Sequence, residues 1–269
     1  MLLLATGLPA VASAATVVKV WGAPAAAVQA LRMAQPGVVW LSEPESTVQP
    51  QLQLAWQQDA YQQALASGSR MPILVLSHQR IPASRLRSQD AVLVWGPPLT
   101  RQVQLARRLM PLAKRIGVLY RAINQAEITS LSSSFSGTNV QIVPLLVEAP
   151  LTARVLAEAA DSVDVFVASN DDALFNRDSA KLILLTAYHH KHAVIGPTPA
   201  FVNAGAVATE AVPKQALIMA IVARVSDWQA CGDLGDTQSI NTFAPVINTQ
   251  VARSLSLVVP ADVLREVKP

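Results

Sequence analysis

Short runs of β-branched and apolar residues alternate with longer runs of helical periodicity along almost the whole 269-residue chain. The first such run, Thr16–Trp21 (TVVKVW), precedes an Ala-rich segment at 23–33, and the alternation continues to a last apolar run at 193–196. Strands that alternate with helices form parallel sheets with right-handed crossovers. The sequence therefore predicts an α/β protein.

The alternation begins a second time in the middle of the chain. An amphipathic helix expected at 100–109 is ended by Pro111, and Arg115–Tyr120 (RIGVLY) then starts a new cycle. Two runs of about 100 residues each suit two compact lobes better than one continuous sheet. We therefore predict two doubly wound parallel-sheet lobes joined by hinge crossovers.

The individual elements follow from the same periodicity. Strands are expected at 16–21, 38–41, 53–56, 72–77, 91–95, 115–120, 140–146, 163–168 and 193–196. Helices are expected at 23–33, 59–66, 100–109, 124–135, 151–160 and 172–189, and a turn-rich surface loop at 230–239.

The first fourteen residues, MLLLATGLPAVASA, have the features of an export signal. An apolar stretch ends in Ala12-Ser13-Ala14, an A-x-A cleavage site that makes Ala15 the mature N-terminus. No basic residue precedes Lys19, so an apolar N-terminal strand is the alternative. The longest apolar run in the body, 216–223, is far shorter than the ~20 residues of a membrane-spanning helix. We predict a periplasmic protein secreted by a cleavable signal peptide, residues 1–14.

Composition and absent motifs exclude several classes of function. The formal net charge is only +3, and the Lys and Arg residues are scattered, which argues against a nucleic-acid partner. The chain has no GxGxxG, GxxxxGK[ST], CxxC, HExxH or GxSxG motif. Three histidines at 189, 190 and 192 close a predicted helix, where the helix dipole favours them, with no carboxylate alongside. We predict no cofactor, no metal and no enzymatic activity.

Aromatic and polar side chains follow many of the predicted strands. Ligands of open α/β sheets bind outside the carboxyl ends of the strands. Core packing is the alternative for each aromatic residue, but the group suits a cleft with aromatic walls and a few orienting polar groups. The predicted ligand-binding residues are Trp21, Trp56, Gln57, Gln58, Ser77, His78, Tyr120, Asn170, Asp171 and Thr198.

Two adjacent carboxylates occur in the segment VDVFVASNDDALF (163–175). We expect Asp171 to face the cleft and contact the ligand, because it comes directly after a predicted strand. We expect Asp172 to stabilise the positive end of the helix at 172–189, since Asp is a favoured N-cap. The alternative is that the pair only caps the helix and has no ligand role.

Four segments carry a pattern as a set: KRIGVLY (114–120), VDVFVASNDDALF (163–175), AVIGPTPAFVNAGAVAT (193–209) and FAPVINTQVARSLSLVVPADVL (243–264). They resemble the ABC-transporter substrate-binding family typified by tryptophan-binding lipoproteins, whose pattern runs GVLYNP, VDAIFVPTDN, PVFAS…GALAT and INLKTAKALGLTIP. The segments keep that order and spacing, but Thr198-Pro199 replaces an acidic pair of the family. LFNRDSAKLILLTAY (174–188) looks like a divergent proteobacterial branch.

The resemblance implies a type 1 periplasmic-binding fold that holds a small solute between its lobes, without catalysis. Lobe 1 is then 15–113 plus about 205–240, and lobe 2 is 114–204 plus about 241–269. The implied partners are a small-molecule ligand, with amino-acid-like compounds among the candidates, and an ABC permease. A periplasmic sensor of the same fold that signals to a membrane receptor kinase is the alternative.

Overall fold

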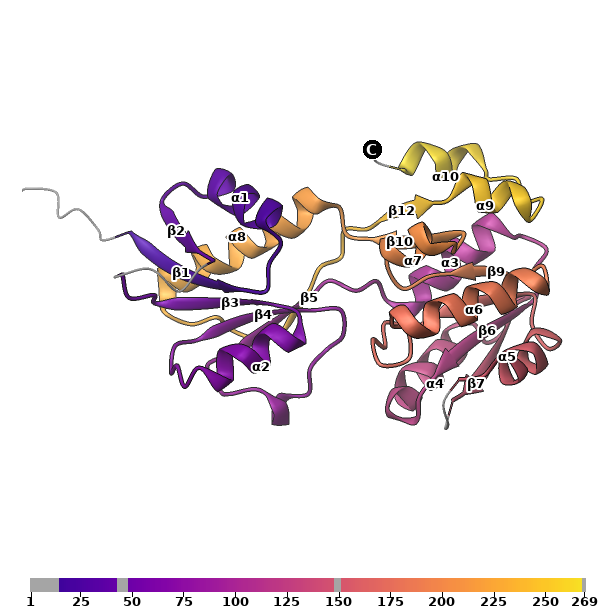
Figure 1. The fold of residues 1–269 in the computed structure, drawn as a ribbon, viewed down its shortest axis with the longest axis horizontal. Coiled ribbons are helices and arrows are strands. Elements are labelled where there is room, and N and C mark those ends of the chain that lie inside the picture. The colour runs from indigo at the N-terminus through magenta and orange to yellow at the C-terminus, as the bar shows by residue number, and fades with distance from the viewer. Residues whose placement is uncertain (1–14, 43–47, 148–150, 268–269) are drawn as a thin grey trace, which may run out of the picture. The chain divides into compact units, whose positions relative to one another are not determined.

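The computed structural model describes residues 15–42, 48–147 and 151–267, so the predicted signal peptide at 1–14 lies outside the described residues. The chain divides into two compact units. The first contains the residues up to Leu76, Ala83–Val92 and Ile218–Asp236. The second contains Ser77–Pro82, Leu93–Leu217 and Thr237–Pro269. Two sheets of six strands each, with helices packed against them, confirm the predicted α/β class (Figure 1).

The first sheet has the strand order β11-β5-β4-β3-β1-β2, and β1 pairs in parallel with both β2 and β3. Helices α1 and α8 lie on one side of this sheet and α2 on the other (Figure 1). Its strands are β1 (Thr16–Trp21), β2 (Val38–Leu41), β3 (Leu52–Trp56), β4 (Ile73–Ser77), β5 (Ala91–Val94) and β11 (Gln238–Ser239). The associated helices are α1 (Ala25–Ala34), α2 (Gln58–Ala66), η1 (Ala83–Arg85) and α8 (Lys214–Cys231).

The second sheet has the order β12-β10-β9-β8-β6-β7. Strands β7, β6, β8, β9 and β10 pair in parallel, and β10 pairs with β12 in the antiparallel direction. Its strands are β6 (Arg115–Tyr120), β7 (Gln141–Leu146), β8 (Val165–Ala168), β9 (Ala193–Ile195), β10 (Ala208–Ala211) and β12 (Ala244–Ile247). Its helices are α3 (Leu99–Leu109), η2 (Ala122–Asn124), α4 (Gln125–Ser134), α5 (Ala153–Ala160), α6 (Arg177–His189), α7 (Pro199–Ala204), α9 (Thr249–Ser254) and α10 (Ala261–Glu266).

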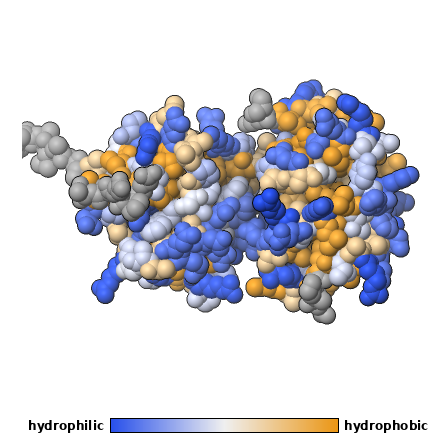
Figure 2. All heavy atoms as spheres, viewed as in Figure 1, coloured by the Kyte–Doolittle hydropathy of each residue, from blue (hydrophilic) through white to orange (hydrophobic). Residues whose placement is uncertain are grey.

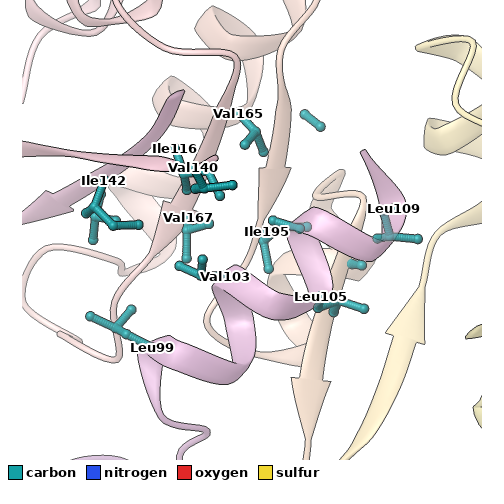
Figure 3. Close-up of a cluster of buried hydrophobic side chains, with 14 of the residues drawn as sticks. Leu99, Val103, Leu105, Leu109, Ile116, Val140, Ile142, Val165, Val167 and Ile195 are labelled. Carbon is teal, nitrogen blue, oxygen red and sulfur yellow. The ribbon is translucent and has the colours of Figure 1, made fainter. Parts of the chain in front are cut away.

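Both faces of the second sheet are covered by apolar side chains. One core cluster joins the sheet to α3, α4, α9 and α10, and another joins it to α5, α6 and α7. The central strand β8 is therefore apolar along its whole length, and all four of its residues are buried. Figure 3 shows Leu99, Val103, Leu105 and Leu109 of α3 beside residues of the strands.

Helix α3 belongs to the second unit, whereas the sequence led us to expect it in lobe 1, within 15–113. Its apolar side packs on the second sheet, in the same cluster as Ile116 and Val165. Strand β10, Ala208–Ala211, likewise pairs with β9 and β12 of the second sheet, although 205–240 was expected in lobe 1. Amphipathicity shows that a helix packs on a sheet, but it does not show on which sheet it packs.

Two local expectations also differ from the structure. The helix expected at 172–189 begins only at Arg177, because Asn176 is its N-cap and forms a capping box with Ser179. The segment expected to be a loop at 230–239 contains the end of α8, at Cys231, and the two-residue strand β11. The missed strand is very short and has two exposed residues, so it carries no periodicity.

Among the described residues, no helix combines the length and the apolar character that crossing a membrane requires. The face of the molecule drawn in Figure 2 mixes hydrophilic and hydrophobic residues.

Candidate functional site

Each sheet has one place where the strand order reverses. Strand β1 lies between β2 and β3, and β6 lies between β7 and β8. The connections that leave these neighbouring strands therefore run in opposite directions, which opens a crevice at the carboxyl edge of the sheet. Both switch points are consequently the places to look for ligand-binding side chains.

At the first switch point, Trp21 ends β1 and Trp56 ends β3. Both side chains are half-buried. The indole nitrogen of Trp21 donates to Gln53 Oε1 at 2.7 Å, and Lys19 Nζ lies 3.9 Å from the centre of the Trp21 ring. This tryptophan is thus held in place while part of its ring surface stays exposed.

Gln57 lies between β3 and α2 as the N-cap residue of the helix, Gln58 is the first residue of α2, and both are exposed. Gln57 has φ +80° and ψ 169°, a backbone conformation that residues other than glycine rarely adopt. Strain of this kind costs of the order of 1–3 kcal/mol and is concentrated at functional sites. Its position at a switch point makes Gln57 a candidate ligand contact.

At the second switch point, Arg121 directly follows β6 and Asp171 lies just beyond β8. Arg121 Nε donates to Asp171 Oδ2 at 2.6 Å, and Nη2 donates to Oδ1 at 2.7 Å. The Asp171 side chain is 2% exposed and the Arg121 side chain 42%. Hydrogen bonding to Asp171 raises the pKa of the Arg121 guanidinium, so this group is a cation at neutral pH.

The carboxylate of Asp171 has further donors around it. Asn124 Nδ2 lies 2.9 Å from Oδ2, and the backbone N–H of Ala173 donates to Oδ1 at 3.1 Å. Each oxygen therefore accepts two hydrogen bonds from within the second unit. We expected this carboxylate to face a ligand, but its burial and its four donors make it the anchor of Arg121.

Asp172 is exposed, with 78% of its side-chain surface accessible. The N-cap role that we expected of Asp172 is taken by Asn176, whose side chain accepts from the backbone of Asp178 and Ser179. The residues between them are used for packing, since Leu174 and Phe175 are buried in the core. Asp172 thus belongs to the carboxyl edge of the sheet rather than to α6.

His78 and Asn170 lie together in the second unit. The His78 ring stacks on Trp95 with 3.8 Å between ring centres, and its Nδ1 is 3.8 Å from Asp172 Oδ1. Burial lowers the pKa of His78 to about 4, so at neutral pH the imidazole is uncharged and this approach is not an ion pair. Gln79 donates to the Asn170 carbonyl, and Asn170 Nδ2 donates to Pro97 O at 2.8 Å.

Gly96 permits the close approach of the segments that carry His78 and Asn170. A Cβ at this position would lie 2.2 Å from the His78 carbonyl oxygen and 2.8 Å from Asn170 Nδ2. Backbone atoms cannot move aside as a flexible side chain does, so any larger residue would displace the segment. The glycine is required by the close approach of the two segments.

The other predicted site residues are Tyr120, Ser77 and Thr198. Tyr120 is buried, and its hydroxyl donates to Gln125 Oε1 at 2.8 Å. Ser77 is buried, and its hydroxyl accepts from the backbone of Gln79. Thr198 is the N-cap residue of α7, without a side-chain hydrogen bond to the helix.

The structure thus places the predicted residues in two groups. Trp21, Trp56, Gln57 and Gln58 belong to the first unit, and the remaining six belong to the second. Arg121 and Asn124 were missing from the prediction. The signal for Arg121 was present, since a cation directly follows the strand RIGVLY, but its pairing with Asp171 depends on β6 and β8 being neighbours.

A cavity of about 620 Å³ lies at the opposite, amino-terminal edge of the second sheet. Its lining includes Lys114, Arg115, Asp164 and Ala193, at the beginnings of β6, β8 and β9. None of the predicted ligand residues lines it, and the strand order gives that edge no switch-point crevice. We therefore place the candidate site at the carboxyl edge.

Metal binding has no support in residues 15–42, 48–147 and 151–267, where no group of three or more His, Cys, Asp or Glu side chains could hold an ion. Taken separately, the group in the first unit offers aromatic contact to a small molecule, and the group in the second unit offers hydrogen bonds from a fixed cation.

Solved structures with this fold include substrate-binding proteins. An ABC domain in complex with L-Trp from Streptococcus pneumoniae is 17% identical, with a TM-score of 0.64 over 94% of this chain and 98% of that one. A ligand-free, open substrate binding protein with adhesive properties from Clostridium difficile is 14% identical, with a TM-score of 0.69 over 92% and 97%. A periplasmic ribose ABC transporter structure from Conexibacter woesei is 14% identical, with a TM-score of 0.53 over 94% and 98%.

At these identities the likeness establishes the fold, which is that of type 1 periplasmic binding proteins. No curated protein matched the sequence. The family described as "ABC transporter substrate binding protein" matches residues 96–268, which include the second switch point. The predicted family resemblance is confirmed: this chain belongs to the ABC transporter substrate binding protein family.

Proposed function

We propose that the protein is the periplasmic solute-binding component of an ABC import system. The solute contacts side chains at the carboxyl ends of the strands of both sheets, and the protein delivers it to a membrane permease without chemical change. The observation that supports this most is the position of Trp21, Trp56, Arg121 and Asp171 at the two switch points. Such crevices bind ligands in open α/β sheets.

The composition of the two groups fits this role. Trp21 and Trp56 offer apolar ring surface, and Gln57 and Gln58 offer exposed amides beside it. Arg121 offers a charged donor group held by a buried partner. Small-molecule sites combine an apolar wall with a few fixed polar groups in this way.

Ligand binding is tested by thermal shift and by calorimetric titration with defined compounds. The panel contains the twenty L-amino acids, ribose and other monosaccharides, short monocarboxylates and nucleosides. The amino acids and sugars are included because one structure with this fold is a complex with L-Trp and another is a periplasmic ribose ABC transporter structure. A bound solute raises Tm by mass action, so at least one class should stabilise the protein.

Trp21→Ala and Trp56→Ala should each weaken binding of that solute by about tenfold, the loss typical of an aromatic contact residue. Trp228→Ala is the matched control, because this half-buried tryptophan of the first unit is on α8, next to Gln229, which bonds Thr16 at the start of β1. If no compound of any class raises Tm, or if Trp228→Ala weakens binding as much, the proposed site is wrong.

Export follows from the proposed location in the periplasm. Removal of residues 1–14 would leave Ala15 at the mature N-terminus. Intact-mass analysis of the periplasmic fraction measures this directly. A chain that keeps Met1 and is found only in the cytoplasm would contradict the proposal.

A further inference from the structure

The guanidinium of Arg121 has two edges that can each donate a pair of parallel hydrogen bonds. The edge formed by Nε and Nη2 is occupied by Asp171, at 2.6 and 2.7 Å. A guanidinium has five N–H donors, so both donors of Nη1 and the second donor of Nη2 remain. Arg121 makes no other side-chain hydrogen bond with the described residues, and 42% of its side chain is exposed.

The edge formed by Nε and Nη2, which we call the inner edge, is fixed by groups that cannot easily move. The outer edge is the one formed by Nη1 and Nη2. Asp171 is 2% exposed and is also held by Asn124 Nδ2 and by the backbone N–H of Ala173. Because the carboxylate is fixed from several sides, the guanidinium plane is fixed with it. A donor group that is ordered before binding loses less entropy when a ligand arrives.

The outer edge lies where a ligand is expected. Leu119 of β6 pairs with Ala168 of β8, so the residues just past these two strands are neighbours at the switch point of the second sheet. Arg121 is two residues after Leu119, and Asp171 is three residues after Ala168. The pair therefore closes the base of the crevice that this strand order produces.

We infer that the outer edge of Arg121 binds a carboxylate of the solute, and that Asp171 and Asn124 are positioning residues for it. This assignment rests on the proposed solute-binding function and adds the chemical class of the ligand. Two parallel N–H donors match the two oxygens of a carboxylate, in the bidentate geometry that arginine favours.

The charges around Arg121 favour one negative charge over two. Asp171 already balances the charge of the guanidinium, so the pair is neutral as a whole before a ligand arrives. Like charges repel, so a dianionic phosphate is disfavoured more strongly than a single carboxylate. The fixed pair thus selects by charge as well as by shape.

The experiment compares carboxylates with their uncharged counterparts. Each L-amino acid and short monocarboxylate of the panel is titrated beside its carboxamide, and ribose and a set of phosphate monoesters are titrated as separate arms. The solute that binds should be a carboxylate, with its carboxamide at least about tenfold weaker. Arg121→Lys should weaken the carboxylate by about tenfold or more and reduce the preference over the carboxamide, since an ammonium cannot use both edges.

Arg115→Lys is the matched control. Arg115 begins the same strand that Arg121 follows, pairs with Asp164 at 2.9 Å, and is also partly exposed, but it lies at the opposite edge of the sheet. This change should leave carboxylate affinity unaltered. The double variant Arg121→Met, Asp171→Asn removes both charges together, so no buried carboxylate is left unpaired, and it should bind carboxylate and carboxamide equally.

Three results would overturn the assignment. The first is equal affinity for a carboxylate and its carboxamide in the parent protein, and the second is an unchanged preference in Arg121→Lys. The third is binding of ribose or a phosphate monoester in place of any carboxylate, which rejects the ligand class and leaves solute binding intact. Failure of every arm to raise Tm would instead reject the proposed function itself.

Discussion

Asp171 and Glu210 are both buried carboxylates of the second unit, but their surroundings differ. Each Asp171 oxygen accepts two hydrogen bonds. Glu210 Oε2 has no hydrogen-bond partner among the described residues, and Arg101 Nη2 lies 3.5 Å from it. Burial accordingly raises the pKa of Glu210, since the charged form has lost water without full compensation.

Glu210→Gln is therefore expected to raise Tm at pH 7. A carboxyl group whose pKa is raised by folding favours the native state below its ordinary pKa of about 4.3, and this contribution is lost as pH rises through the folded value. The difference in Tm between Glu210→Gln and the parent protein should thus become smaller as the pH is lowered towards 4. Thermal melts across pH 4–7 measure it, and a variant less stable than the parent at pH 7 would contradict the account.

Asp171→Asn should cost about 2 kcal/mol of unfolding free energy, because a buried charged hydrogen-bond acceptor is lost. Asp172→Asn, which changes the neighbouring exposed carboxylate, should cost less than about 0.5 kcal/mol. Urea unfolding of the two variants gives the comparison. Equal losses would show that the buried pairing with Arg121 contributes nothing to stability.

At the scale of elements, Asp90 joins several segments of the first unit. Its carboxylate accepts from Tyr61 Oη and from the backbone of Ile73 at the start of β4, both at 2.9 Å. Arg87 donates to both Asp90 oxygens and to two backbone carbonyls, those of Ser69 and Met71. Burial and the hydrogen bond to Asp90 raise the pKa of Tyr61 to about 12.

Asp90→Asn should therefore lower the unfolding free energy by about 3 kcal/mol, the scale for breaking a buried pair by removing one partner. The control is Glu158→Gln, whose partner Arg154 is an exposed neighbour on α5, and a change below about 0.5 kcal/mol is expected there. Denaturant titration of both variants decides between a structural network and a dispensable surface contact.

Most strands and helices could be predicted because each carries its own periodicity. β8 is recognisable from VFVA, and α3 from its amphipathic pattern. The start of α6 could not be found in this way, since Asp171 and Asp172 are as good N-caps by type as Asn176. The partnership of Arg121 with Asp171 was also hidden, because it joins residues 50 positions apart through the order of the strands.

On the scale of the whole molecule, acid should destabilise the fold through His78. Its pKa is lowered by burial to about 4, so the folded state favours the neutral ring. The stabilisation is complete above the unfolded pKa of about 6.5 and is lost as pH falls towards 4, which amounts to roughly 3 kcal/mol.

His78→Gln should flatten this part of the pH–stability curve, and His189→Gln, which changes an exposed histidine at the end of α6, should leave it steep. Urea unfolding at several pH values between 4 and 7 measures both slopes. Identical slopes in the parent and His78→Gln would show that another group titrates.

Neither unit is one continuous stretch of chain. The first takes Ile218–Asp236, most of helix α8 and the turn after it, from beyond nearly the whole second sheet. During synthesis, therefore, strands β1 to β5 of the first sheet emerge long before helix α8, which packs on one of its sides. In a nascent chain, the face of the first sheet on which α8 packs is not fully covered until the helix has been made up to residue 231. Domains generally fold as units, so the first unit cannot be completed earlier. The order of the segments thus delays completion of the first unit until α8 has been synthesised, so this part of the chain stays unfolded, and able to pass through a translocation channel, for longer.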